Sequence, residues 1–179
     1  MAGAYRGAVS ATTPPATLRP AIVPDVISIA AIYGHAVRES VATFDLQDPP
    51  TDYWWTKVTS TAPGDHVVVV EEDGSVVGFA YSTAFRPRPA YARTRETSIY
   101  LLPESVGRGL GRLTYAHLLS LLRTDRMHSA VAVVAQPNPA SNALHESFGY
   151  RLIGTLREVG RKFDRWVDTR WYQILLEQP

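Results

Sequence analysis

A glycine-rich hexapeptide in the middle of the chain most limits what this sequence can fold into and bind. Residues 106–111 read Val-Gly-Arg-Gly-Leu-Gly, so that glycine stands at every second position. Glycine lacks a Cβ atom, and its backbone can therefore turn sharply and approach a bound molecule closely. Apolar residues then recur with helical spacing as far as residue 122, which predicts that the loop opens into a helix. Free amides at a helix start bind anions such as the pyrophosphate of a nucleotide-like cofactor.

Two common nucleotide-binding motifs do not match this loop. No Lys-Ser or Lys-Thr pair follows the glycines, which excludes the Walker A loop. The dinucleotide fingerprint needs a further glycine where the chain has Arg112 to Thr114, so it is excluded as well. Residues 96–102 have the composition of a strand that Pro103 ends. A strand, a glycine loop and a helix in this order favour a phosphate site, and an ordinary turn before a helix is the alternative.

This arrangement resembles the acetyl-CoA site of the GNAT superfamily of N-acetyltransferases, whose loop reads Gln/Arg-x-x-Gly-x-Gly/Ala. Gly109 and Gly111 match that pattern, whereas Val106 stands at its first position. Valine offers no polar contact, so the resemblance implies binding by the backbone amides together with Arg108 and Arg112.

A second stretch is similar to another cofactor segment of the same superfamily. Residues 138–150 read Asn-Pro-Ala-Ser-Asn-Ala-Leu-His-Glu-Ser-Phe-Gly-Tyr, and in detail they resemble the phosphinothricin acetyltransferase branch. Further similarities to this branch lie at residues 42–44, 85–91, 154–162 and 166–168. In this order and spacing the motifs cover about residues 17–176, nearly the whole chain.

The predicted fold class is α/β (α+β), with one mixed, mostly antiparallel central sheet of about seven strands and helices on both faces. Residues 130–135 are small or β-branched, as expected of a strand that is buried on both faces. Residues 16–179 are expected to form a single acetyltransferase domain, and residues 1–15 a disordered tail. Strands are predicted at 16–22, 66–72, 76–81, 94–102, 130–135, 151–159 and 166–176, and helices at 24–37, 51–61, 109–124 and 139–148.

Composition narrows the class of protein further. The 179 residues carry a formal net charge of only +1, which disfavours nucleic acid and membranes as partners. Cysteine is absent, which excludes disulfides, cysteine nucleophiles and cysteine metal sites and fits a reducing, cytoplasmic compartment. The histidines show no ligand spacing, so no metal site is expected. Of the 18 basic residues only Lys57 and Lys162 are lysines.

Glu96 is the expected general base. An amine acceptor is mostly protonated at neutral pH and cannot attack a thioester until it loses that proton. Glu96 begins the strand that leads into the glycine loop, where the phosphinothricin branch has its catalytic carboxylate. A glutamate starts from a pKa of about 4.3, so burial or a water relay has to raise its basicity. The alternative is an exposed glutamate paired with Arg93 or Arg95.

Two residues are candidates for the proton donor. The thioester oxygen gains from a hydrogen-bond donor, and the leaving thiolate gains from a general acid. His145 stands four residues before Gly149, where many superfamily members have a tyrosine that protonates the thiolate. Tyr100 is the second candidate, because its hydroxyl can donate to either atom. A packed histidine and a packed strand tyrosine are the alternatives, and the choice between the two donors stays open.

The resemblance also implies an acceptor class. Arg86 and Arg88 stand where the branch has basic residues, and Tyr91 matches its tyrosine. Guanidinium groups suit carboxylate or phosphinate. The implied substrate is a small amino-acid-like amine such as phosphinothricin, methionine sulfoximine or methionine sulfone. Phe44 is expected to wall the pocket, with core packing as the alternative.

Acetyl-CoA is implied as co-substrate and a homodimer as assembly. Two other functions stay open, namely a catalytically silent acetyl-CoA sensor, which Val106 favours, and an N-acetyltransferase of proteins or peptides. The residues expected to hold acetyl-CoA are Ile99, Tyr100, Leu101, Gly107, Arg108, Gly109, Leu110, Gly111, Arg112, Asn138 and Ser141.

Overall fold

The computed structural model of the chain describes residues 16–176. The tail expected at residues 1–15 therefore lies outside the described residues. The described part of the chain forms a seven-stranded sheet in the order β1-β2-β3-β4-β5-β7-β6. In chain order the elements are β1 Thr17–Pro20, α1 Val26–Glu39, α2 Thr51–Val58, β2 His66–Glu72, β3 Ser75–Ala84, β4 Thr94–Leu101, α3 Leu110–Thr124, β5 Ser129–Ala135, α4 Pro139–Ser147, β6 Arg151–Lys162 and β7 Arg165–Leu175.

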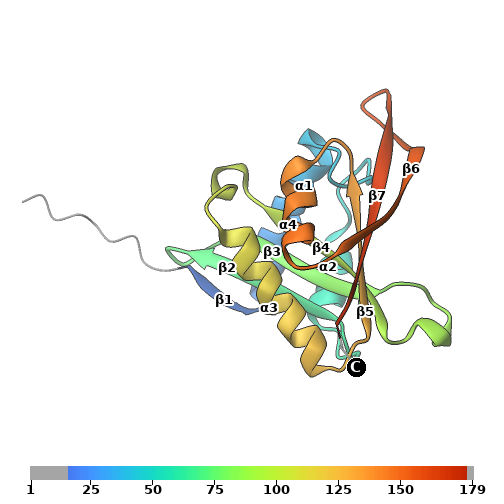
Figure 1. Cartoon of the computed structure of the whole chain (residues 1–179). Helices are drawn as coiled ribbons and strands as arrows, with labels where there is room; N and C mark the ends of the chain where they lie inside the picture. The colour runs from blue at the N-terminus through green and yellow to red at the C-terminus, as the bar shows by residue number, and fades with distance from the viewer. Residues whose placement is uncertain (1–15, 177–179) are drawn as a thin grey trace, which may run out of the picture.

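The sheet is mixed and covered on both faces, which confirms the predicted fold class. Only β4 and β5 pair in parallel, and the other neighbouring strands are antiparallel. In Figure 1, α3 and α4 lie in front of the sheet, and α1 and α2 lie behind it. No helix within residues 16–176 is long and apolar enough to cross a membrane.

Two apolar layers fill the space between the sheet and the helices. The layer under α3 and α4 includes Leu118, Leu119 and Leu122, each without exposed surface. The layer under α1 and α2 is built around Trp54 and Phe79, which are equally buried. β5 lies in the middle of the sheet, and all but one of its residues are buried, as predicted for residues 130–135.

The element boundaries differ from the sequence prediction mainly at four places. α2 ends at Val58 instead of residue 61, β3 extends to Ala84 instead of residue 81, and one helix start and one hairpin differ as well. The helix predicted from residue 24 begins with a separate 3₁₀ turn over Val23–Asp25 before α1 starts. Only Phe163 and Asp164 separate β6 from β7, and both adopt left-handed backbone with φ of 50° and 56°. A Phe-Asp pair is not among the favoured hairpin turns, so the sequence predicted a longer loop there.

The parallel backbone pairing of β4 with β5 is short, and a side-chain hydrogen bond links the two strands where it ends. It comprises three residue pairs, the last of which joins Glu96 to Val131. Beyond this point the hydroxyl of Thr97 donates a hydrogen bond of 3.2 Å to the carbonyl of Val131. The hydroxyls of Tyr115 and Tyr150 lie 2.7 and 3.1 Å from Thr97 Oγ1 and 3.0 Å from each other. This buried cluster ties α3 and the start of β6 to the point where the strands diverge.

Replacing Thr97 by valine should destabilise this point. The substitution keeps the side-chain shape but leaves buried hydroxyl and carbonyl groups with fewer partners, so we expect the free energy of unfolding to fall by about 1–3 kcal/mol. Thr97→Ser retains the hydroxyl and serves as the matched control, with a smaller loss. Urea unfolding of the three proteins measures the difference. Equal stability of Thr97→Val and the wild type would contradict this role.

Candidate active site

A cavity of about 340 Å³ opens where β4 and β5 diverge. One wall is β4 from Thr97 to Leu101, and the opposite wall is residues 133–135 of β5. The beginning of α4 and the last turn of α1 complete its lining. Since the pairing with β5 stops at Glu96, the edge of β4 along this cavity has no neighbouring strand. Its backbone groups are therefore free to bind an extended ligand.

The glycine loop lies at one end of this cavity. Val106 and Gly111 contribute to the lining. Gly107 and Gly109 adopt left-handed backbone with φ of 80° and 82°, and Gly109 is the N-cap of α3. An added Cβ at either position would meet nothing within 4 Å, so it is the backbone conformation that requires glycine here. The first amides of α3 have no intrahelical partner and offer an anion site beside the cavity.

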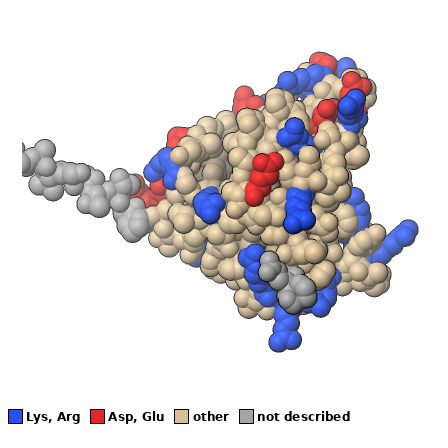
Figure 2. All heavy atoms as spheres, in the orientation of Figure 1, with Lys and Arg blue, Asp and Glu red and all other residues tan. Residues whose placement is uncertain are grey.

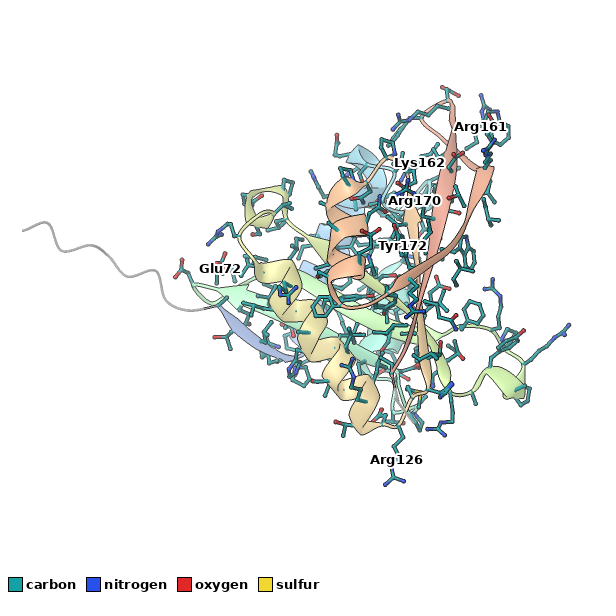
Figure 3. The ribbon with its side chains drawn as sticks, viewed as in Figure 1. Glu72, Arg126, Arg161, Lys162, Arg170 and Tyr172 are labelled. Carbon is teal, nitrogen blue, oxygen red and sulfur yellow. The ribbon has the colours of Figure 1, made fainter. Side chains whose placement is uncertain are left out.

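The two arginines of the loop brace it against the rest of the protein. Arg108 forms two hydrogen bonds, of 2.7 and 2.6 Å, with the carboxylate of Glu72 at the end of β2, which is labelled in Figure 3. Arg112 donates to the hydroxyl of Ser147 at 2.9 Å and lies over the ring of Phe148. Both guanidinium groups therefore have protein partners, and the backbone amides are the free donors of this loop.

The remaining residues expected at the cofactor divide into two groups. Asn138 caps α4 by accepting the amide of Ser141 at 3.0 Å. Leu110 is 4% exposed, so only its backbone can reach a ligand. The expected residues that line the cavity are Ile99, Tyr100, Leu101, Gly111, Asn138 and Ser141, whereas Gly107, Arg108, Gly109, Leu110 and Arg112 lie outside its lining.

Glu96 is half-buried on the face of β4 that is covered by α1 and α2. Burial raises the pKa of its carboxyl group, and the positive charges of Arg86 and Lys57 oppose that rise. Arg95 projects from the opposite face and lies 3.6 Å from Asp65, so it does not neutralise Glu96. Within residues 16–176 the Glu96 carboxylate has no ion-pair or hydrogen-bond partner. It is therefore a carboxylate of raised basicity that is available to take a proton.

His145 lies at the cavity but is built into the core. It is 3% exposed, and its Nδ1 donates to the carbonyl of Ser141 at 2.7 Å. Its ring stacks on Tyr172 with a centroid separation of 5.9 Å. Burial lowers its pKa, so the ring is neutral at pH 7 with its proton on Nδ1. Nε2 is buried without a partner in the described part of the chain. In this state Nε2 can accept a proton but has none to give.

Tyr100 lies at the cavity, and its phenol group stays protonated at neutral pH. It lines the cavity, and burial raises its pKa well above the ordinary value. Its ring packs edge-on against that of Tyr33, with the two ring centroids 4.9 Å apart. The hydroxyl of Tyr33 in turn donates to Asp45 at 2.7 Å and lies 2.6 Å from Thr43 Oγ1. These hydrogen bonds hold Tyr33 in place, and the Tyr33 ring in turn packs against the ring of Tyr100 beside the cavity.

The segment between α1 and α2 is held over this network by the hairpin of β6 and β7. Lys162, 3% exposed, donates to the carbonyl of Thr43 at 2.8 Å. In Figure 3 it turns inward from the hairpin, whereas its neighbour Arg161 projects outward. Phe44 packs so closely on Gly160 that an added Cβ would overlap its ring, and it remains 37% exposed. Phe44 is therefore a contact to the hairpin that keeps a free face.

The predicted acceptor residues lie in the loop between β3 and β4, which projects from the lower right in Figure 1. The guanidinium carbon of Arg86 lies 4.6 Å from the ring centroid of Phe85 and 6.0 Å from that of Trp171. From this position its positive charge lowers the pKa of Glu96 and so opposes the effect of burial. Arg88 is exposed, and Tyr91 packs edge-on against Phe85 at 5.6 Å. Arg86 is thus brought together with Glu96, whereas Arg88 and Tyr91 remain on the loop surface.

Sequence reasoning missed Tyr33, Asp45 and Lys57 as residues of this site. Tyr33 and Asp45 are bound to each other across the helix α1 and the segment that follows it. Lys57 lies over the rings of Tyr53 and Tyr81, on the same face of the sheet as Glu96. The rarity of lysine in this arginine-rich chain is the one sequence signal that could have marked Lys57.

A cavity between diverging strands, a glycine loop at its end and a basic carboxylate beside it define an acyltransferase site. The sequence pattern of the Acetyltransferase (GNAT) family matches residues 29–150. The chain belongs to this acetyltransferase family, and the expected enzyme class is confirmed.

Acetyltransferases of known name are similar in sequence to this chain along nearly its whole length. A phosphinothricin N-acetyltransferase of Streptomyces coelicolor is 40% identical over 161 residues, which cover 87% of this chain and 94% of that protein. An L-methionine sulfoximine/L-methionine sulfone acetyltransferase of Salmonella typhimurium is 34% identical over 164 residues, which cover 90% and 95%. The crystal structure of a GNAT superfamily phosphinothricin acetyltransferase from Sinorhizobium meliloti in complex with AcCoA matches with a TM-score of 0.85 at 37% identity, covering 89% and 88%.

The role of the loop backbone can be tested at Gly109. Alanine in left-handed conformation costs about 1–2 kcal/mol, so Gly109→Ala should displace the amides and raise the Kd of acetyl-CoA by about 10-fold. Gly74→Ala is the matched control, because Gly74 has φ of 75° and open space around it in the β2–β3 turn. Calorimetric titration and urea unfolding should show similar destabilisation in both variants but weaker binding in Gly109→Ala alone. Unchanged binding would count against the amide site.

Proposed function

We propose that this chain transfers the acetyl group of acetyl-CoA to the α-amine of a small amino acid that carries a second polar or anionic group. The observation that carries the proposal is the half-buried carboxylate of Glu96, which has no partner within residues 16–176 and immediately precedes the divergence of β4 and β5. Phosphinothricin, methionine sulfoximine and methionine sulfone, for which the relatives are named, are amino acids with a tetrahedral polar head.

The free amides at the start of α3 and the unpaired edge of β4 suit acetyl-CoA. An extended cofactor with a pyrophosphate fits a helix start for its anionic part and a strand edge for its amide-containing arm. The similar structure from Sinorhizobium meliloti, which contains AcCoA, supports this choice. Acetyl-CoA supplies an activated thioester, and the protein residues supply position and proton transfer.

Glu96 acts as the general base in this proposal. Its pKa is raised by burial, which improves a carboxylate as a base toward an ammonium group. Tyr100 acts as the donor, because its hydroxyl stays protonated and the residue lines the cavity in which charge would develop on the thioester oxygen. His145 is the less suitable donor, since its one ring proton is bound to the carbonyl of Ser141.

The acceptor is proposed to bind on the face of the sheet covered by α1 and α2, beside Glu96. Arg86 offers a guanidinium group to the polar head of the substrate. The free face of Phe44 offers an apolar wall to the substrate's carbon chain. Arg88 and Tyr91 are exposed on the same loop as Arg86 and can contact the acceptor only if it extends beyond the pocket.

The proposed assembly is a homodimer formed through β6. This edge strand and the start of β7 expose large apolar side chains, among them Ile153, Val159 and Trp166, which are 60%, 51% and 61% exposed. Exposed apolar surface along an unpaired strand edge favours association with a second copy.

Acidic and basic groups lie side by side at the hairpin end of the face in Figure 2. Mixed charge and a net charge of +1 support a cytoplasmic enzyme without nucleic acid or membrane partners.

An acceptor panel tests the proposed activity. Release of CoA thiol from acetyl-CoA is measured with phosphinothricin, methionine sulfoximine, methionine sulfone and the twenty common amino acids. We expect kcat/KM above about 10⁴ M⁻¹ s⁻¹ for an amino acid with a tetrahedral polar head. Acetyl-CoA binding without turnover of any acceptor would instead identify a cofactor sensor. Turnover of peptides alone would identify a peptide acetyltransferase.

The role of Glu96 predicts a specific pH dependence. A base works when deprotonated, so kcat/KM of the wild type should fall as the pH drops through the raised pKa of Glu96. Glu96→Gln should lower kcat/KM by about 10²–10⁴-fold and remove this acidic limb. Glu158→Gln, exposed on β6 and far from β4 in sheet order, is the matched control. A Glu96→Gln variant with full activity at every pH would rule out Glu96 as the base.

A further inference from the structure

The two lysines of the chain are more buried than most of its arginines, and they differ in their partners. Lys57 is half-buried and Lys162 is buried, whereas most of the arginines are exposed. The ammonium group of Lys162 has its partner in the carbonyl of Thr43. Within the described residues no hydrogen bond or ion pair reaches the ammonium group of Lys57. A half-buried cation without an anion is costly, so a function for it has to be sought.

The position of Lys57 is fixed by two aromatic rings. Its Nζ lies 4.6 Å from the ring centroid of Tyr53 and 5.0 Å from that of Tyr81. Such contacts attract a cation but leave its hydrogen-bond donors free. Tyr53 precedes Lys57 by one helical turn, and Tyr81 belongs to β3. The ammonium group is therefore held against the sheet instead of moving freely in solvent.

Register places Lys57 beside the proposed base. Tyr81 pairs with Ser98 and Thr83 pairs with Glu96, so Tyr81 and Glu96 lie on one face of the sheet at diagonal positions. Burial lowers the pKa of Lys57, and the negative charges of Asp65 and Glu96 oppose that shift. These two carboxylates are the acidic groups that act on it.

Arg86 acts on Glu96 from another element. It belongs to the segment after β3, is exposed, and rests on Phe85 and Trp171. Lys57 comes from α2 and lies deeper against the sheet. Glu96 is thus accompanied by an inner cation from α2 and an outer cation from the loop. An amino acid with an anionic or polar side-chain head has two groups to match them.

We propose that Lys57 binds the α-carboxylate of the acceptor and so presents its α-amine to Glu96. In an α-amino acid a single carbon separates the amine from the carboxylate, so a carboxylate held by the inner cation brings the amine next to the base. Arg86 then takes the side-chain head, which points outward along the loop. This inference rests on the proposed function and makes the acceptor an α-amino acid rather than any small amine.

Paired acceptors test this inference. The wild type and Lys57→Met, which keeps most of the side-chain length without the charge, are compared on methionine sulfone and on the amine that lacks its carboxylate, 3-(methylsulfonyl)propylamine. We expect Lys57→Met to lower kcat/KM for methionine sulfone by about 10- to 100-fold. For the simple amine, which has no carboxylate for Lys57 to bind, kcat/KM should stay within about 2-fold of the wild type. Lys57→Arg should recover part of the loss.

Controls separate this role from damage to the fold or to Glu96. Arg126→Met removes a cation at the far end of α3, which projects into solvent in Figure 3, and should change neither acceptor. Lys57→Met should be at least as stable as the wild type in unfolding curves and should bind acetyl-CoA with an unchanged Kd. Equal losses for both acceptors, with a shifted acidic limb of the pH profile, would show that Lys57 only tunes Glu96 and would overturn the inference, as would no loss at all. A wild type inactive on every amino acid would refute the proposed function itself, and the inference with it.

Discussion

The early divergence of β4 from β5 is the constraint on which the rest of the site depends. Three parallel residue pairs fix the two strands side by side, and the hydroxyl of Thr97 makes the last contact between them. The cavity exists because the ladder stops there, and the glycine loop reaches it because β4 leads directly into α3. A buried triangle of hydroxyls from Thr97, Tyr115 and Tyr150 holds the geometry. Such networks stabilise only when every member is satisfied.

Because side chains alternate along β4, the residues that pack under α3 and the residues proposed for proton transfer lie on opposite faces of the sheet. Thr97 and Ile99 point toward the layer under α3, whereas Glu96 and Tyr100 point toward the layer under α1 and α2. Arg95, on the α3 face, is buried and forms an ion pair with Asp65. Its positive charge therefore does not neutralise Glu96 on the other face. A shift of one residue in this register would exchange the two sets.

The acceptor side is assembled from elements that are distant in sequence. Tyr33, Thr43 and Asp45 are joined by short hydrogen bonds, and Lys162 of the β6–β7 hairpin anchors the same segment. The segment carrying Phe44 is thereby held over the sheet although it has no helix or strand of its own. Each of these contacts buries polar groups with their partners, which limits the freedom of the segment.

The sequence by itself determined the fold class, most elements and the position of the glycine loop between β4 and α3, because these depend on local patterns. Glycines at 107 and 109 permit the left-handed backbone that the turn requires, and the runs around them specify strand and helix through short-range preferences. The bracing of Arg108 by Glu72, the neutral state of His145 and the placement of Lys57 on the same face of the sheet as Glu96 were decided by tertiary structure. They depend on which groups meet across the sheet and on how much water is excluded there, and neither is encoded in neighbouring residues.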